Sequence, residues 1–240
     1  MHEQSLSIVV PAKNEEGVIG KFLESLRRQT YSMRDVPIII ADAASTDHTR
    51  SVVESFRKDL NVKIIDGGMP SVGRNRGAKE VSSSYVVFID ADMVLDDPTL
   101  IERTLRLAQQ RRLGLVTTNV ACRTTNLIFR FVYFLNNCSQ RASQCVAQPY
   151  ATGMFMFFER KTFEKLGGFN EKAVYAEDFL LSRQVPKRKF AVVPGHITTS
   201  DRRFRKMGVW KVVRMFLLTA WESARGNDKI FFKPTDYFDN

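Results

Sequence analysis

Two carboxylates stand one residue apart at the end of an apolar run. The run is Tyr85 to Ile89, and Asp90 and Asp92 follow it with Ala91 between them. Such a run is typical of a strand buried on both faces of a parallel sheet, and ligands bind beyond the carboxyl ends of strands in open α/β sheets. Carboxylate oxygens suit Mg²⁺ and Mn²⁺, which commonly carry phosphate, so the pair predicts a metal and phosphate site. Taken alone, the same pair could merely cap a turn.

Polar residues also follow three earlier apolar runs. They form the segments Pro11-Ala12-Lys13-Asn14-Glu15, Asp42-Ala43-Ala44-Ser45-Thr46-Asp47 and Gly73-Arg74-Asn75-Arg76-Gly77. A carboxylate such as Asp42 can accept from a base N–H, Glu15 can reach ribose hydroxyls, and Arg74 can offer a planar fork to phosphate. The segments therefore predict a nucleotide pocket. Each also has a structural interpretation, as a helix cap, a turn or a closely packed glycine.

The elements that must position these residues alternate along the chain. Apolar runs at 6–10, 37–41, 62–65, 85–89 and 115–120 predict strands, and amphipathic stretches at 15–28, from 46, at 71–80 and at 98–111 predict helices. This βαβ pattern predicts an α/β fold with a Rossmann-like, mostly parallel central sheet flanked by helices.

Composition fits one large domain. The chain has 240 residues, of which 44% are hydrophobic and 26% charged. We expect a nucleotide-binding half at about 1–95, an acceptor and catalytic half at about 96–205 and a helical tail at about 206–240. No run reaches the roughly 18 apolar residues of a membrane span, and the start lacks the features of a signal peptide, so we expect a cytoplasmic protein. The three cysteines show no paired spacing and are expected to be reduced.

The net charge of +10 is concentrated in one segment. Residues 183–214 hold ten Lys or Arg and a single acid, Asp201. Such a segment suits a pyrophosphate, an anionic lipid surface or nucleic acid.

Residues 207–224 predict a basic amphipathic helix. This helix either lies on an anionic membrane, as in a peripheral protein on the inner face of that membrane, or packs on the domain. The aromatic stretch 127–135 is expected mainly in the core, with a lipid-facing role as the alternative.

The ordered motifs together resemble the family 2 glycosyltransferases. These enzymes have the GT-A fold and transfer sugars from nucleotide diphosphate sugars with inversion. The resemblance covers roughly residues 5 to 205. Besides the segments above, it depends on Asp90-Ala91-Asp92, Gly167-Gly168-Phe169-Asn170-Glu171 and Glu177-Asp178.

The resemblance implies a role for each motif. Asp178 would be the general base, and Asp92, helped by Asp90, would bind a divalent cation, Mn²⁺ or Mg²⁺. His196 is a weaker candidate for a further metal ligand, because a lone His after Pro-Gly more often lies in a surface turn. The nucleotide-sugar donor, expected to be a UDP-sugar, would contact a larger set of residues: Pro11, Ala12, Asn14, Glu15, Asp42, Arg74, Asn75, Asp90, Ala91, Glu177, Arg202 and Arg203. We also expect Arg202 and Arg203 to close over the diphosphate of the bound donor.

Two departures from the family pattern bear on mechanism. Many members carry two acids after the second strand, whereas Ala43 follows Asp42 here, so base recognition rests on Asp42 alone. Processive synthases carry a Gln-x-x-Arg-Trp signature, and the comparable residues here are Ser200 to Phe204. Transfer of a single sugar to a saccharide or lipid-linked acceptor is therefore the better prediction, within cell-envelope polysaccharide or glycolipid synthesis.

Three other classes compete with a sugar transferase. A sugar nucleotidyltransferase needs a Gly-rich basic loop after the first strand, where this chain has Pro11 to Glu15. A nucleic-acid-binding protein would explain the basic charge, but its aromatic residues would alternate with the cations, so no nucleic acid is expected as a partner. A basic nucleotide- or membrane-binding protein without transfer activity is opposed by the presence of both Asp92 and Asp178. The sequence does not specify the oligomeric state.

Overall fold

A seven-stranded sheet forms the centre of the computed structural model. The structure describes residues 5–202, 205, 208, 214 and 231–232. The strands are β1 (Leu6–Ala12), β2 (Ile38–Asp42), β3 (Val62–Asp66), β4 (Tyr85–Ile89), β5 (Leu115–Arg123), β6 (Phe155–Glu159) and β7 (Phe190–Ser200). The helices are α1 (Ile19–Arg27), α2 (Thr49–Ser55), α3 (Pro70–Lys79), α4 (Leu100–Arg111), α5 (Leu127–Ser143), α6 (Arg160–Lys165) and α7 (Glu177–Ser182), with a 3₁₀ turn η1 (Lys187–Lys189).

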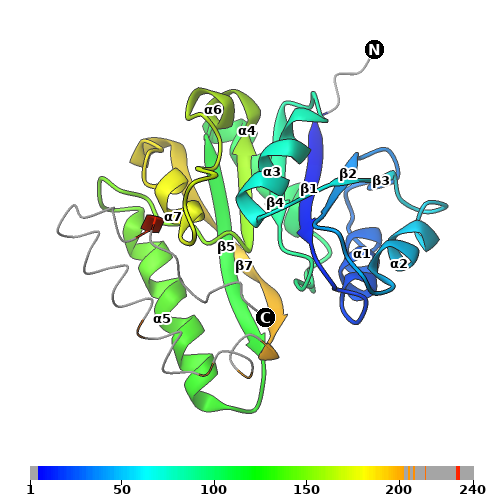
Figure 1. Cartoon of the computed structure of the whole chain (residues 1–240). Coiled ribbons are helices and arrows are strands. Elements are labelled where there is room, and N and C mark those ends of the chain that lie inside the picture. The colour runs from blue at the N-terminus through cyan, green and yellow to red at the C-terminus, as the bar shows by residue number, and fades with distance from the viewer. Residues whose placement is uncertain (1–4, 203–204, 206–207, 209–213, 215–230, 233–240) are drawn as a thin grey trace.

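The strands are arranged in the order β3-β2-β1-β4-β6-β5-β7. Strands β1 to β4 pair in parallel, as do β5 and β7, whereas β6 runs antiparallel to both of its neighbours. The prediction of a mostly parallel α/β sheet is confirmed. Parallel pairing brings the carboxyl ends of β1, β2 and β4 to one edge, because each of these strands returns through a helical crossover. Figure 1 shows α1 and α2 beside β2 and β3, and α5 beside β5 toward the other end of the sheet.

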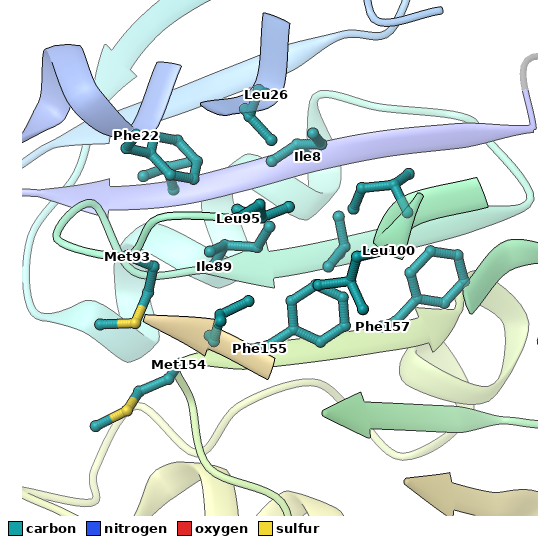
Figure 2. Close-up of a cluster of buried hydrophobic side chains, with 14 of the residues drawn as sticks. Ile8, Phe22, Leu26, Ile89, Met93, Leu95, Leu100, Met154, Phe155 and Phe157 are labelled. Atoms are coloured by element: carbon teal, nitrogen blue, oxygen red, sulfur yellow. The ribbon is translucent and has the colours of Figure 1, made fainter. Parts of the chain in front are cut away.

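Apolar side chains fill both faces of the sheet. In β1, Ile8 and Val10 belong to one core cluster, whereas Val9 belongs to the other. Figure 2 shows the first cluster, in which Ile8 lies near Phe22 and Leu26 of α1. Adjacent strand residues point to opposite faces, so a strand covered on both sides must be apolar throughout. This requirement explains why β4 is apolar throughout and β2 is apolar up to Asp42, its last residue.

Helix α3 lies very close to β1 because glycine faces the strand. A Cβ at Gly77 would come within 2.3 Å of Cγ1 of Val9, so any other residue would push the helix away from the sheet. The same helix carries Arg74 and Asn75, and its close packing fixes the depth at which these side chains enter the site.

The second half of the fold departs from the prediction. The sequence analysis assigned neither β6 nor β7 as a strand. The stretch 127–135 was expected mainly in the core, and this is wrong for most of its residues. They form the start of α5, where Phe129 and Tyr133 are buried but Leu127, Ile128, Phe131, Phe134 and Leu135 are exposed.

The predicted tail helix at 207–224 lies outside the described residues, apart from Gly208 and Arg214. Arg203 also lies outside them. Among the described helices, none has the length and apolar character required to cross a bilayer.

Candidate active site

Two loops at the carboxyl ends of β1 and β2 are held together by side-chain hydrogen bonds. The Asn14 N–H donates to Oγ of Ser45 (2.9 Å), and Oδ1 of Asn14 accepts from the Thr46 N–H (2.9 Å). Asn14 has a φ of 53°, a left-handed conformation that Asn tolerates better than most residues. The Glu15 N–H donates to Oγ1 of Thr49 (2.7 Å). These hydrogen bonds therefore fix the positions of the two loops at the predicted nucleotide pocket.

Asp42 lies at the base of these loops, and only 4% of its surface is exposed. Its Oδ1 accepts from the Ser45 hydroxyl (2.5 Å) and its Oδ2 from the Ser45 N–H (3.3 Å), while Nε of Arg50 lies 3.8 Å from Oδ2. Asp42 thus orders the loop between β2 and α2. Ala12 ends β1 directly opposite Asp42, and its carbonyl accepts from the Ala43 N–H (2.8 Å).

Arg202 reaches across the site from the segment after β7. Its Nη2 donates to both carboxylate oxygens of Glu15 (2.7 and 2.6 Å) and lies 3.9 Å from Oδ2 of Asp92. Burial raises the pKa of Glu15, and the charges of Asp92 and Asp90 add to this effect, although Arg202 acts in the opposite direction. Several carboxylates therefore gather here, and a cation is favourable between them.

A buried arginine joins the end of β4 to the start of α7. Arg74 donates through Nη2 to Oδ1 of Asp90 and through Nη1 to Oε1 of Glu177, both at 2.7 Å. Its guanidinium also lies over the ring of Phe169, 5.2 Å from the centroid. Burial by itself would lower the pKa of Arg74, but the charges of Asp90, Glu177 and Asp178 outweigh it and raise the pKa. Arg74 is therefore a permanent cation among three acids.

Asp178 lies in the first turn of α7 and is partly buried. Its Oδ2 accepts from the Gly153 N–H (2.5 Å) and its Oδ1 from the Phe179 N–H (2.7 Å). Burial, followed by the charge of Glu177, raises the pKa of Asp178 to about 6. A carboxylate with a pKa of this size is ionised at neutral pH yet is a stronger base than an ordinary Asp.

Gly153 is a site residue that the sequence analysis missed. A Cβ at this position would lie 2.9 Å from Nη2 of Arg74 and 3.4 Å from Oδ2 of Asp178, so the loop before β6 can approach both groups only as glycine. The signal available in the sequence was weak: a single Gly between a helical stretch and the Phe-rich run that forms β6.

Replacing Gly153 with Ala is therefore expected to displace Arg74 or Asp178 and to lower transfer activity by about 100-fold, the scale set by a displacement of about 1 Å in a catalytic group. Steady-state kinetics with a nucleotide-sugar donor would measure the loss. Gly17→Ala is the matched control, because a Cβ at Gly17 meets nothing within 4 Å. Equal activities of the two variants would show that the tight fit at Gly153 is unimportant.

Asn75 connects α3 to the glycine-rich loop at 167–171. Its Oδ1 accepts from the Phe169 N–H (2.9 Å), and its Nδ2 donates to the Phe169 carbonyl (2.8 Å) and to Oε1 of Glu171 (2.9 Å). Both ends of the amide are thus engaged with the protein. Asn75 thereby fixes the backbone of Phe169, whose ring lies against the Arg74 guanidinium.

The acids that could hold a metal are Asp92 and Asp90. Oδ2 of Asp92 lies 3.4 Å from the Thr199 hydroxyl, and Asp90 is already bonded to Arg74. His196 is exposed on β7 opposite Asn119, beside a register shift between β5 and β7. Within the described residues, no group of three or more His, Cys, Asp or Glu side chains surrounds a common position. A carboxylate pair still fits Mg²⁺ or Mn²⁺ when substrate phosphates supply the remaining ligands.

The structure thus brings most of the predicted residues to one edge of the sheet. Ala91, between the two acids, is 3% exposed, and Pro11 lies in β1 next to α3, with its Cβ 3.8 Å from the position of a Cβ at Gly73. Arg74 bridges Asp90, one of the two predicted metal acids, and Glu177, which directly precedes the predicted base Asp178.

The sequence of the chain is similar to those of known glycosyltransferases. Residues 7–167 match the family model described as glycosyl transferase family 2. The chain is 33% identical over 98 residues to poly(ribitol-phosphate) beta-N-acetylglucosaminyltransferase TarS of Staphylococcus aureus, which covers 39% of this chain and 17% of TarS. It is 31% identical over 113 residues to GalNAc(5)-diNAcBac-PP-undecaprenol beta-1,3-glucosyltransferase of Campylobacter jejuni, which covers 44% of this chain and 34% of that protein. The chain therefore spans about a third or less of these two relatives.

Solved structures share the fold. The crystal structure of residues 1–349 of S. aureus TarS in complex with UDP-GlcNAc superposes with a TM-score of 0.66 at 18% identity, covering 83% of this chain and 59% of that one. The mannosyltransferase PcManGT of Pyrobaculum calidifontis, in complex with GDP-Man and Mn²⁺, superposes with a TM-score of 0.67 at 19% identity, covering 86% and 62%. The GT-A fold is thereby confirmed.

Proposed function

The chain belongs to glycosyl transferase family 2, and from this membership we propose that it transfers a single sugar from a nucleotide diphosphate sugar to a hydroxyl of a saccharide or lipid-linked acceptor, with inversion at the anomeric carbon. The observation that carries the proposal is the position of Asp178. The pKa of Asp178 is raised, and Arg74 links its neighbour Glu177 to Asp90, which follows β4. Family membership also favours sugar transfer over the nucleotidyl transfer considered above.

Asp178 would act as the general base. As the acceptor oxygen attacks the anomeric carbon, its proton passes to Asp178, and the bond between that carbon and the diphosphate oxygen breaks. The hydrogen bonds from Gly153 and Phe179 orient the carboxylate before the reaction begins. Removing the proton as the new bond forms lowers the barrier, since a neutral hydroxyl is a poor nucleophile.

The donor would lie over the edge of the sheet at β1, β2 and β4. Asp42 and the loop from Pro11 to Glu15 would hold the base and ribose. We propose uracil as the base, by analogy with TarS, whose structure contains UDP-GlcNAc. Arg202 would exchange its contact with Glu15 for one with the diphosphate, and it already stands 3.9 Å from Asp92.

A divalent cation fits the same place. PcManGT, which shares the fold, is in complex with Mn²⁺. Asp92, with help from Asp90, would hold Mn²⁺ or Mg²⁺ here, and the ion would supply neutralising charge for the leaving diphosphate. The chain's own contribution is the pair of acids that would attract the cation, together with Arg202, whose Nη2 lies 3.9 Å from Oδ2 of Asp92.

Nucleotide binding tests the proposal directly. UDP with Mn²⁺ or Mg²⁺ is expected to raise the melting temperature, because a ligand that binds only the folded state stabilises it. At a concentration 100-fold above Kd, the stabilisation is about 2.7 kcal/mol, or a shift of about 5–10 °C for a chain of this size. GDP, CDP and TDP should give smaller shifts, and a chelator should reduce the shift with UDP.

Asp92→Ala should lose the metal-dependent part of this shift. Asp59→Ala is the matched control, because Asp59 is an exposed acid that precedes β3, at the opposite end of that strand from the site. A shift that is insensitive to chelator and to Asp92→Ala would contradict the metal assignment. If no nucleotide produced a shift, the donor proposal itself would fail.

A further inference from the structure

Helix α5 has its apolar side toward solvent. Leu127, Ile128, Phe131, Phe134 and Leu135 are between 48% and 73% exposed. At 100° per residue, these five residues fall within one stripe of about 120° along the helix. The rings of Phe131 and Phe134 stack with centroids 6.2 Å apart. We call these five residues the α5 face.

The opposite side of the same helix contacts the sheet through both polar and apolar side chains. The Asn137 side chain accepts from the Val120 N–H and donates to the Val120 carbonyl, both at 2.9 Å. Gln140 is fully buried and donates to the Thr118 carbonyl (3.3 Å). Buried apolar contacts come from Phe129 and Tyr133.

In an ordinary surface helix the apolar stripe faces the core, whereas α5 carries most of its large apolar side chains on the exposed side. Within the part of the chain that the structure describes, α5 is anchored through its other side, and the five side chains of the α5 face remain largely exposed. A contiguous exposed apolar patch of this kind on the surface of a protein marks an interaction site.

Charge and size indicate the partner. The chain has no Asp or Glu between Glu102 and Glu159, and Arg130, which adjoins the α5 face on the same helix, is exposed. An amphipathic helix with Phe and Leu on one side and Arg beside them is typical of segments that lie in the headgroup region of an anionic bilayer. A second copy of the chain fits less well, because a stable dimer needs about 20–30 residues from each partner.

We propose that the α5 face docks on the surface of an anionic lipid bilayer. The helix lies in the plane of the interface, with the apolar side chains of the face among the lipids and Arg130 near the headgroups. Lipid binding of this kind does not depend on the proposed transfer reaction, and it can be measured without a donor or an acceptor.

Docking would involve the same helix that supports the site. The Tyr150 hydroxyl donates to Oδ1 of Asn136 (2.7 Å), and the Thr152 N–H donates to Oε1 of Gln140 (3.1 Å). The next residue is Gly153, whose N–H holds Asp178. A bilayer bound at α5 would therefore lie next to the loop that orients Asp178. This arrangement suits an acceptor that is carried in the lipid.

Co-sedimentation of the full chain with vesicles tests the proposal. One set contains phosphatidylcholine alone, and the other contains about one-third phosphatidylglycerol. The wild type should bind the anionic set, and the variant with Phe131→Ser and Phe134→Ser should bind at least about tenfold more weakly. Arg130→Gln should lose about fivefold, the effect of one cation near an anionic surface.

Met69→Ser is the control, because Met69 is an exposed apolar residue before α3 and far from α5 in the sequence. Thermal melting of each variant confirms folding, and more than half of each Phe side chain is already exposed. Anionic binding that survives the double Phe substitution would overturn the proposal, as would failure of the wild type to bind either vesicle set. Loss of a dimer in the double variant, without lipid binding by the wild type, would assign the face to a second copy instead.

Discussion

Asp178→Asn is expected to lower kcat by about 1,000-fold while leaving the affinity for the nucleotide nearly unchanged. Removing a positioned general base typically costs between about 10² and 10⁴ in rate. Asn keeps the shape of Asp and can still accept one of the two N–H groups, from Gly153 and Phe179, that hold the carboxylate. The loss should therefore appear in the chemical step. Single-turnover kinetics and nucleotide titration would separate the rate from the binding.

The pH profile gives an independent readout. The base must be ionised, and burial together with the charge of Glu177 raises the pKa of Asp178 to about 6. We expect kcat/KM of the wild type to rise about tenfold per pH unit below this value and to level off above it. In Asp178→Asn the rise should vanish from the residual activity. Glu164→Gln, which alters an exposed carboxyl on α6, should retain both the rate and the profile. Full activity of Asp178→Asn would assign the base to another group.

Stability should follow the same pKa with a defined sign. The pKa of Asp178 in the folded protein lies above the ordinary value of 3.8, so between these two pH values the folded state binds more protons than the unfolded state. The contribution of Asp178 to the free energy of unfolding therefore falls as pH rises from about 3.8 to about 6. Asn does not titrate. The stability of the wild type relative to Asp178→Asn should decrease over this interval, as measured by denaturant unfolding.

The first half of the fold could be predicted because local signals and topology agree there. Each strand from β1 to β4 is a short apolar run followed by polar residues, and a right-handed crossover is nearly obligatory between parallel strands. The gathering of Asp42 and Asp90 at one edge then follows from the strand direction alone. The residues at the carboxyl edge of this half of the sheet could therefore be predicted from the sequence.

The second half could not be predicted in the same way. Strand β6 runs antiparallel between β4 and β5, and no local pattern specifies which strands a Phe-rich run will separate. Hydrophobicity also fails to predict which side of α5 is buried. Phe131 and Phe134 are typical core residues but are exposed, whereas the polar Gln140 is buried and bonds the sheet. Aromatic content alone does not indicate which side of a helix is buried.

The central ion pairs are likewise invisible in the sequence. Arg74 precedes Glu177 by more than a hundred residues, and its planar guanidinium was expected to bind donor phosphate rather than the protein's own acids. The structure instead places Arg74 where it neutralises Asp90 and Glu177 beneath the site.

Arg74→Met is expected to destabilise the protein by about 3–5 kcal/mol, because removing one partner of a buried ion pair leaves the others without compensation. In a chain of this size, the melting temperature should fall by about 10 °C. Met approximates the length of the Arg stem but supplies no charge to Asp90, Glu177 and Asp178. Lys79→Met, an exposed substitution on the same helix, is the matched control and should shift the melting temperature by no more than a degree or two.

Two further measurements distinguish loss of charge from loss of packing. Without Arg74 the pKa of Asp178 should rise, because a nearby cation favours the ionised carboxylate, so the acid limb of the kcat/KM profile should move above pH 6. Adding Glu177→Gln should recover part of the lost stability, since the second substitution removes one of the uncompensated acids. The destabilisation should also shrink as pH is lowered and the carboxylates become protonated. A Tm loss that is independent of pH and unaffected by Glu177→Gln would mean that Arg74 acts through its stacking on Phe169 rather than through its charge.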